Sequence, residues 1–423
     1  MKDIRVTRHP SGLTVVTASS AQMASVSLGL WVGVGGRHEP AELNGAAHFL
    51  EHMLFKGTQR RSPEQISQAV EGIGGYLNAF TSEEHTCYFC KAPHVHLRNL
   101  LDVLMDMAIE PRLAPRDIRL EREVIKEEVA MCQDDPQQQV QELINETLWP
   151  NHPLGRPLTG TVRSLTALRR RNLMEFKQRT YVAGNMVLAA AGHLRHEDLL
   201  RAADRHARRL EPGGPPPWAP APVSQDAPRV RLFTRSTAQT QMVVAYRTCS
   251  RHDPRVYAMR LLNVILGENM SSRLFQELRE RRGLVYYVQS QISFFHDTGT
   301  FDVTLGLDTA NLPAALRLVL ATLRKIAEAP PPRGEMARAR DFVLGQMALS
   351  LENTEHQMNW LGEQWLGLGR IIPPAQVQRK LEAVTPRDLQ AAARDFFQPD
   401  RLSVALVSPL KSPRPVEQVI RRG

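Results

Sequence analysis

The chain has 423 residues, of which 42% are hydrophobic and 23% are charged. This balance is typical of a folded globular protein and excludes wholesale disorder, and the length predicts two or three domains. The net charge of +9 is compatible with an anionic partner. However, basic and acidic residues are mixed along the chain and the motifs of nucleic-acid-binding folds are missing, so we expect no nucleic-acid partner.

The sequence also lacks the features of a membrane or secreted protein. Residues 1–20 alternate charged and apolar residues, without the continuous apolar segment of a secretory signal. No run approaches the roughly 18 apolar residues of a membrane span. Four cysteines do not make a disulfide scaffold in a chain of this length, which favours a reducing compartment. We therefore predict a cytoplasmic location and no membrane partner.

The first half of the chain alternates predicted strands and helices. A β-branched run at 24–34 predicts a strand and leads into a predicted helix at 46–55. The segment 74–92 alternates apolar and polar residues as strands do, and the apolar spacing of 96–109 is that of a helix. A charged helix follows at 114–132, with a proline suited to its first turn.

A connector rich in proline and glycine, 211–228, divides the chain nearly in half and excludes regular structure. The second half then repeats the course of the first. The matching segments are a strand at 239–247 and helices at 257–267, 311–329 and 332–349. This correspondence favours an internal duplication.

We therefore predict an α+β fold with two tandem homologous domains, each a sheet with helices packed against it. The N-terminal domain covers 1–210 and the C-terminal domain covers 229–423, with the linker 211–228 between them.

The strongest chemical motif is His48-Phe49-Leu50-Glu51-His52. Residues four apart lie on one face of a helix, so His48 and His52 can present two imidazoles to one ion. Imidazole is a common zinc ligand, and a catalytic zinc site needs at least one further protein donor. Glu51 borders the same face, where it can accept a proton from a water molecule. The alternative is that ordinary helical residues have this spacing by chance.

The charged helix 114–132 offers the further donor in Glu121 and Glu128. The alternative for these carboxylates is a solvated acidic face. When the two halves are aligned, Glu128 falls opposite Gln346 and Glu121 falls opposite Ala339, and the helix matching the His-bearing one contains no histidine. The acids and the imidazoles are thus absent together from the second half, as a metal site confined to the first half predicts.

The segments HFLEHMLFKGT (48–58) and EREVIKEEV (121–129) resemble the pitrilysin or insulinase family of zinc metallopeptidases, closest to its mitochondrial-processing-peptidase-like members. The resemblance implies that Zn²⁺ is held by His48, His52 and Glu128, with Glu51 as the general base and Glu121 supporting catalysis. It implies an endopeptidase for extended peptides or unstructured presequences. It also implies mainly antiparallel sheets in two domains that form half of a clamshell.

The same resemblance implies two substrate-binding elements. GGYLNAFTSEEHTCY (74–88) is similar to the family's edge strand, which binds the substrate backbone by strand addition. Its implied substrate-binding residues are Asn78, Ala79, Phe80 and Thr81. In the second half, Arg279 and Tyr286 resemble a pair that binds substrate and supports the oxyanion. From the residues alone, Arg279 is a surface charge on a helix and Tyr286 a strand residue.

Because one chain carries both the metal motif and the Arg279 and Tyr286 pair, we expect a homodimer in which one subunit covers the zinc of the other. A heterodimer with an inactive paralogue is the alternative. The alternative function is a non-catalytic scaffold or assembly subunit on the same fold, as some relatives are. Such subunits usually have eroded motifs, whereas the motif is intact in this sequence.

Overall fold

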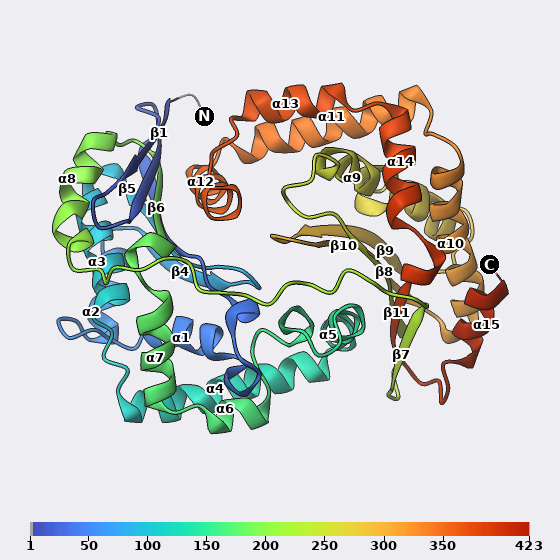
Figure 1. Ribbon diagram of the computed structural model, residues 1–423, viewed down its shortest axis with the longest axis horizontal. Coiled ribbons are helices and arrows are strands. Elements are labelled where there is room, and N and C mark those ends of the chain that lie inside the picture. The colour runs from blue at the N-terminus through green and yellow to red at the C-terminus, as the bar shows by residue number, and fades with distance from the viewer. Residues whose placement is uncertain (1–2, 423) are drawn as a thin grey trace. The chain divides into compact units, whose positions relative to one another are not determined.

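The computed structural model describes residues 3–422, which form two compact units, each built on its own β-sheet (Figure 1). The first unit comprises the residues up to Ala130 together with Arg156–Ala219 and Ala348–Pro373. The second comprises Met131–Gly155, Pro220–Met347 and the residues from Pro374 onward. Among residues 3–422, no helix has both the length and the apolar character needed to cross a membrane.

The sheet of the first unit has six strands in the order β1-β2-β6-β3-β5-β4. The strands are β1 (Asp3–Arg8), β2 (Thr14–Ser19), β3 (Ser25–Val32), β4 (Tyr76–Thr81), β5 (Thr86–Pro93) and β6 (Met186–Gly192). All neighbours are antiparallel except β2 and β6. Strand β4 lies at the edge of this sheet.

The sheet of the second unit has five strands in the order β7-β11-β8-β10-β9. They are β7 (Arg229–Thr234), β8 (Thr240–Thr248), β9 (Tyr287–Phe294), β10 (Gly299–Leu307) and β11 (Ser403–Ser408). Only β7 and β11 are parallel. The shared pattern, with one parallel pair beside antiparallel neighbours, confirms the predicted duplication and the predicted α+β class.

Helices cover both faces of the first sheet. They are α1 (Ala46–Leu54), α2 (Pro63–Glu71), α3 (Leu97–Ile109), α4 (Pro115–Asp134), α6 (Val162–Ala167), α7 (Arg170–Thr180), α8 (His196–Ala207) and α12 (Thr354–Leu368). Because side chains alternate across a strand, Leu30 of β3 packs into the core with α1 and α3, whereas Trp31 packs against Met358 of α12. Most of α4 belongs to this unit, and its last residues pass into the second.

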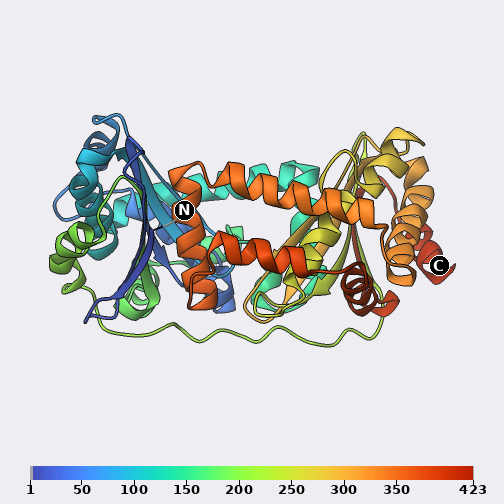
Figure 2. The same cartoon turned by 90° about the horizontal axis from the view of Figure 1, so that it is seen from above.

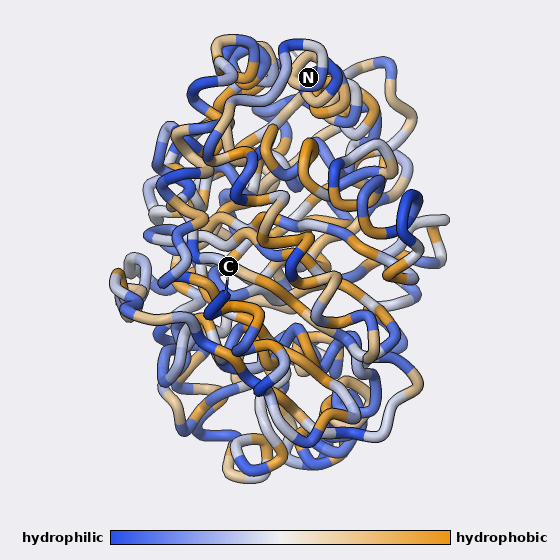
Figure 3. Tube along the Cα trace, turned by 90° about the vertical axis from the view of Figure 1, so that its right-hand side faces the viewer, coloured by the Kyte–Doolittle hydropathy of each residue, from blue (hydrophilic) through white to orange (hydrophobic). Residues whose placement is uncertain are grey.

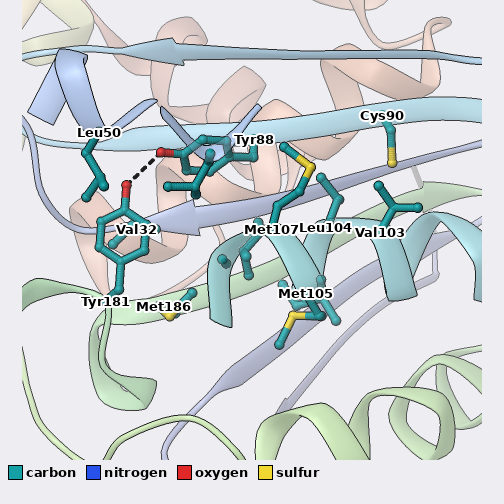
Figure 4. Close-up of a cluster of buried hydrophobic side chains, with 14 of the residues drawn as sticks. Val32, Leu50, Tyr88, Cys90, Val103, Leu104, Met105, Met107, Tyr181 and Met186 are labelled. Atoms are coloured by element: carbon teal, nitrogen blue, oxygen red, sulfur yellow. Dashed lines mark hydrogen bonds between the residues drawn. The ribbon is translucent and has the colours of Figure 1, made fainter. Parts of the chain in front are cut away.

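The core between the sheet and α1 is closely packed (Figure 4). The hydroxyls of Tyr88 and Tyr181 point toward one another and are hydrogen-bonded at 2.7 Å, beside Leu50 of α1. This bond satisfies two polar groups that would otherwise be buried at a cost. The hydrogen bond thereby holds in place two of the core residues on which α1 packs.

The second unit follows the same plan. Its helices are α5 (Pro136–Leu148), α9 (Val256–Asn263), α10 (Leu312–Glu328), α11 (Arg333–Ser350), α13 (Pro374–Ala383), α14 (Pro386–Phe396) and α15 (Arg414–Arg422). Along the chain, hydrophobic and hydrophilic segments alternate as expected for amphipathic elements (Figure 3). The apolar side of α5, including Val140 and Ile144, packs on Val243 of β8 and Ala405 of β11.

Equivalent helices of the two halves are exchanged between the units. Helix α5 precedes the linker but packs on the second sheet, and α12 comes from the second half but packs on the first. The α12 contact is close, because a Cβ added to Gly362 would lie 2.2 Å from the ring of Trp31. The compact units therefore do not coincide with the contiguous predicted domains 1–210 and 229–423. An amphipathic sequence specifies that a helix buries one face, but not which sheet receives it.

The linker 211–228 contains no helix or strand, as predicted, and follows an extended course (Figure 2). It is nevertheless anchored to the first unit. Arg37 lies over the ring of Trp218, 4.2 Å from its centroid, and donates a hydrogen bond to the carbonyl oxygen of Ala219 at 3.0 Å. The connector is therefore held in place at these residues.

Candidate metal centre

Helix α1 carries the two imidazoles. Its apolar residues, among them Phe49, Leu50 and Met53, are fully buried in the core of the first unit, which fixes the rotation of the helix. The opposite face then presents His48 and His52, whose ring centroids are 4.6 Å apart. The predicted pairing of two imidazoles across one helical turn is what the structure shows.

Glu128 of α4 faces both rings. Its Oε2 atom lies 3.9 Å from Nε2 of His48 and 3.7 Å from Nε2 of His52. One ligand atom from each of the three residues lies within 4.8 Å of the others. In the part of the chain that the structure describes, these residues form the cluster of His, Cys, Asp or Glu side chains that could hold a metal ion. Two imidazoles and one carboxylate are a donor set that suits catalytic zinc.

The state of His48 also fits a metal ligand. Burial, and then the charge of the neighbouring His52, lower the pKa of His48 to about 4. The ring is therefore neutral at ordinary pH, which is the form that binds a metal. The residues present thus fit Zn²⁺.

Glu121 of α4 lies behind the ligands and is only 5% exposed. Its carboxylate accepts a hydrogen bond from Nδ1 of His52 at 2.8 Å and lies 2.6 Å from Nζ of Lys56. Burial alone would raise the pKa of Glu121, but the bonds from His52 and Lys56 outweigh burial and lower it. A charged Glu121 fixes the tautomer of His52 with Nε2 available for the ion.

Glu51 lies on α1 between the two histidines and is not one of the three clustered ligands. The hydroxyl of Thr81 donates a hydrogen bond to its carboxylate. Burial raises the pKa of Glu51, although the bond from Thr81 acts in the opposite direction. A raised pKa brings a carboxylate closer to the range in which a general base works at neutral pH.

The predicted substrate-binding residues Asn78–Thr81 lie on β4, the edge strand that pairs with β5 alone within residues 3–422. Asn78 is exposed, whereas the ring of Phe80 packs edge-on against the ring of Trp31, with the two ring centroids 5.5 Å apart. Ala79 packs against the core on the α1 side. The free edge therefore offers backbone groups for pairing, while the bond from Thr81 to Glu51 places this strand beside the metal-binding helix.

Arg279 and Tyr286 both belong to the second unit. Arg279 lies in a π-helical turn, Phe275–Glu280, with its guanidinium 5.1 Å from the centroid of the Phe275 ring. Tyr286 is 58% exposed and precedes β9. Both side chains are at the surface of their unit, and their approach to the metal site stays a prediction.

Two roles in this site were missed at the level of sequence. Lys56 was not singled out, although it lies four residues after His52 in the segment HMLFKGT. Thr81 was expected to bind substrate, and the structure also makes it the hydrogen-bond donor to Glu51. A lysine or threonine carries no chemical signature of its own, so only the folded arrangement shows these contacts.

Comparisons with known proteins identify the family of the chain. Sequence profiles described as "Insulinase (Peptidase family M16)" and "Peptidase M16 inactive domain" match residues 14–162 and 167–343, respectively. An uncharacterized zinc protease of Streptomyces coelicolor is 37% identical over 96% of this chain and 90% of its own length. The uncharacterized zinc protease YmxG of Bacillus subtilis is 31% identical over 94% of this chain and 97% of its own.

Solved structures show the same fold. A protease from Helicobacter pylori superposes with a TM-score of 0.91 at 20% identity, covering 96% of this chain and 99% of that one. A chain described as peptidase M16 inactive domain from Pseudomonas fluorescens gives a TM-score of 0.90 at 19% identity, covering 97% and 99%. Zinc-protease relatives over nearly the whole length support a zinc peptidase in general. The chain belongs to the insulinase family of peptidases, M16.

Proposed function

We propose that the protein is a zinc-dependent endopeptidase that cleaves extended peptides or unstructured presequences, with Glu51 as the general base. The observation that carries the proposal is the convergence of His48, His52 and Glu128, from two helices far apart in sequence, on one point beside Glu51. A solvated acidic face would not bring a carboxylate oxygen within 4 Å of both imidazoles.

His48, His52 and Glu128 would hold Zn²⁺, which when bound polarises the scissile carbonyl and lowers the pKa of a water molecule. Glu51 takes a proton from the attacking water as the water oxygen bonds to the carbonyl carbon, and it then passes that proton to the amine that leaves as the C–N bond breaks. The bond from Thr81 holds the Glu51 carboxylate in one orientation for both steps. Glu121 supports catalysis through the orientation of His52.

The substrate class follows from β4. A free strand edge binds peptide backbone largely independently of side chains, and only an extended chain can pair with it. The edge ends at Thr81, next to Glu51, so a peptide paired along Asn78–Thr81 would pass the general base. We expect a folded protein to be a poor substrate, because its backbone groups are already paired.

Glu51→Gln tests the proposal. The variant keeps the size of the side chain but cannot accept the proton, so Zn²⁺ binding should persist while cleavage of a peptide library, followed by mass spectrometry, is abolished. A chelator should abolish cleavage by the unsubstituted protein. Turnover that is unchanged in Glu51→Gln would remove Glu51 from its role. Cleavage that survives complete removal of the metal would refute the zinc mechanism.

We also propose that Arg279 and Tyr286 act on the zinc site of a second copy in a homodimer. The mass of the active protein in solution, measured by light scattering, tests this arrangement. A monomer under active conditions counts against it, and a need for a second, different chain would favour a heterodimer with an inactive paralogue.

A non-catalytic scaffold is the second candidate function. A chain in the structure of complex III2 from Candida albicans has this fold, with a TM-score of 0.85 at 17% identity over 99% of this chain and 100% of that one. The complete donor set with its hydrogen-bonded Glu121 favours the enzyme. Absence of zinc-dependent cleavage of any peptide in the library would favour the scaffold.

A further inference from the structure

The metal-binding helix α1 lacks an N-terminal cap of its own. It begins after Gly45, which has a left-handed backbone (φ 91°) and no side chain that could accept a hydrogen bond. A helix of 9 residues is marginal by itself, and its first amides have no partner within the helix. His48 belongs to this first turn, whereas His52 belongs to the last. Fraying at the start of α1 would therefore displace one metal ligand and not the other.

Glu39 supplies the missing partner from outside the helix. Its Oε1 atom accepts a hydrogen bond from the backbone amide of Ala47 at 2.7 Å, and its Oε2 atom accepts one from Gly45 at 2.8 Å. The side-chain amide of Asn44 donates to the same Oε2 atom at 3.2 Å. Burial raises the pKa of Glu39 to about 7, although these three hydrogen bonds and the charge of Arg156 act in the opposite direction.

The carboxylate is fixed in place by burial and by its neighbours. Glu39 is only 2% exposed, so water cannot replace it as the acceptor for these amides. Asn44 also donates to the carbonyl oxygen of Pro157 at 3.0 Å, and Arg156 donates to the carbonyl oxygen of Glu39 at 3.0 Å. The loop before α1 is thereby tied to the segment 156–157. Neither Glu39 nor these partners belong to the cluster of metal-binding side chains.

We propose that Glu39 is the N-terminal cap of the metal-binding helix and a positioning residue that keeps the first turn of α1, and with it His48, in register with His52 and Glu128. The role rests on the proposed function in that the site it positions is the proposed zinc site. Glu39 touches neither the ion nor the substrate. It acts through the backbone of Ala47, the residue before His48.

The test compares Glu39→Gln with Glu42→Gln. Glutamine has the shape of glutamate but turns one acceptor into an NH₂ group that faces a backbone amide. Glu42 is exposed and lies three residues further along, in the short 3-10 turn Ala41–Leu43, so its variant replaces a nearby carboxylate without touching the cap. We expect Glu39→Gln to bind Zn²⁺ about tenfold more weakly, as measured by competition with a chromophoric chelator, and Glu42→Gln to bind within about twofold of the unsubstituted protein.

Two further readouts separate positioning from a general loss of stability. The visible absorption spectrum of the Co²⁺-substituted protein reports the arrangement of the ligands, and it should change in Glu39→Gln and not in Glu42→Gln. At saturating Zn²⁺, kcat should fall while KM stays within about twofold, because the β4 edge is untouched. Zinc affinity and the cobalt spectrum need no turnover, so they can be read even if the unsubstituted protein cleaves nothing, which would refute the proposed function alone.

Unchanged zinc affinity and an unchanged cobalt spectrum in Glu39→Gln would overturn the proposal. If that variant fails to fold, hydrogen–deuterium exchange of the unsubstituted protein decides the question. Amides in peptides covering 45–47 should exchange slowly, as capped amides do, and rapid exchange there would overturn the role of Glu39.

Discussion

Glu121→Gln is the sharpest test of how the protein prepares its zinc ligands. The Glu121 carboxylate accepts a hydrogen bond from His52 and pairs with Lys56, and glutamine can satisfy only one of these donors with its single oxygen. A hydrogen bond to a charged group contributes about 1.5–3 kcal/mol. Since about 1.4 kcal/mol corresponds to a tenfold change in an equilibrium constant, we expect Zn²⁺ affinity to fall about 10- to 100-fold.

The assay is competition for Zn²⁺ with a chromophoric chelator, performed at about pH 6 and at about pH 8. Burial lowers the pKa of His52, but the bond to Glu121 and the charges of Glu128, Glu121 and Glu51 outweigh burial and raise it. A proton therefore competes with the metal for His52 at the lower pH. Removing the charge of Glu121 weakens this competition, so the loss of affinity should be larger at about pH 8.

Glu123→Gln is the matched control. It makes the same change of charge on the same helix, but the Glu123 side chain is 68% exposed and pairs with Lys126, three residues further along. Its Zn²⁺ affinity should stay within about twofold of that of the unsubstituted protein, because exposed pairs contribute little. Equal affinities for Glu121→Gln and Glu123→Gln at both pH values would refute the idea that Glu121 orients His52.

Three further changes probe the surroundings of the site. Thr81→Val removes a hydrogen bond that favours the charged form of Glu51, so the pKa of Glu51 should rise. The acidic limb of the plot of kcat/KM against pH should therefore move to higher pH. An unchanged limb would contradict the role of Thr81. In urea denaturation, Gly362→Ala should lower the free energy of unfolding by about 1–3 kcal/mol, because the added Cβ would overlap the ring of Trp31. Gly345→Ala, whose added Cβ would have nothing within 4 Å, should raise this free energy by up to about 1 kcal/mol. Equal effects of the two substitutions would exclude the close contact between Gly362 and Trp31. Asp106→Asn should cost about 1.5–3 kcal/mol, because it removes a buried charged acceptor from Arg60 and Arg61, although both arginines keep their pairs with Asp102. Burial raises the pKa of Asp106 but its hydrogen bonds outweigh burial and lower it, so its contribution is present above the ordinary carboxyl pKa and is lost as the pH falls through the lowered value. The difference in urea stability between the unsubstituted protein and the Asp106→Asn variant should therefore shrink in acid, and a difference independent of pH would contradict the role of that charge.

Local pattern was sufficient to predict the elements but not their partners. The predicted helix 332–349 corresponds to α11 (Arg333–Ser350), and the predicted strand 239–247 corresponds to β8 (Thr240–Thr248). The exchange of α5 and α12 was not predicted, because each helix could bury its apolar face on either of two similar sheets. The choice depends on close fits such as Gly362 against Trp31, which exist only in the folded protein.

The same limit applies to the site. His48 and His52 are four residues apart, so helical geometry alone placed them together, and Glu128 required the comparison of the two halves and the family resemblance. Lys56 and Glu39 act through contacts with groups remote in sequence or on the backbone. No residue spacing encodes such contacts. The sequence therefore identified the three residues that could hold a metal ion, and the structure was needed to find the residues that position them.

The duplication explains why a buried Glu121 favours a metal centre over a solvated acidic face. The buried residues of α4 include Ile118, Glu121 and Ile125, and those of α11 are Met336, Ala339 and Val343. The equal spacing of the two sets places a buried glutamate of the first half where the second half has a buried alanine. A buried carboxylate is costly unless it is paired, and Glu121 is paired with His52 and Lys56. The corresponding helix of the second half has no histidine, so a buried carboxylate there would lack its partner and Ala339 is the more stabilising residue. The carboxylate is therefore retained where there is an imidazole for it to orient.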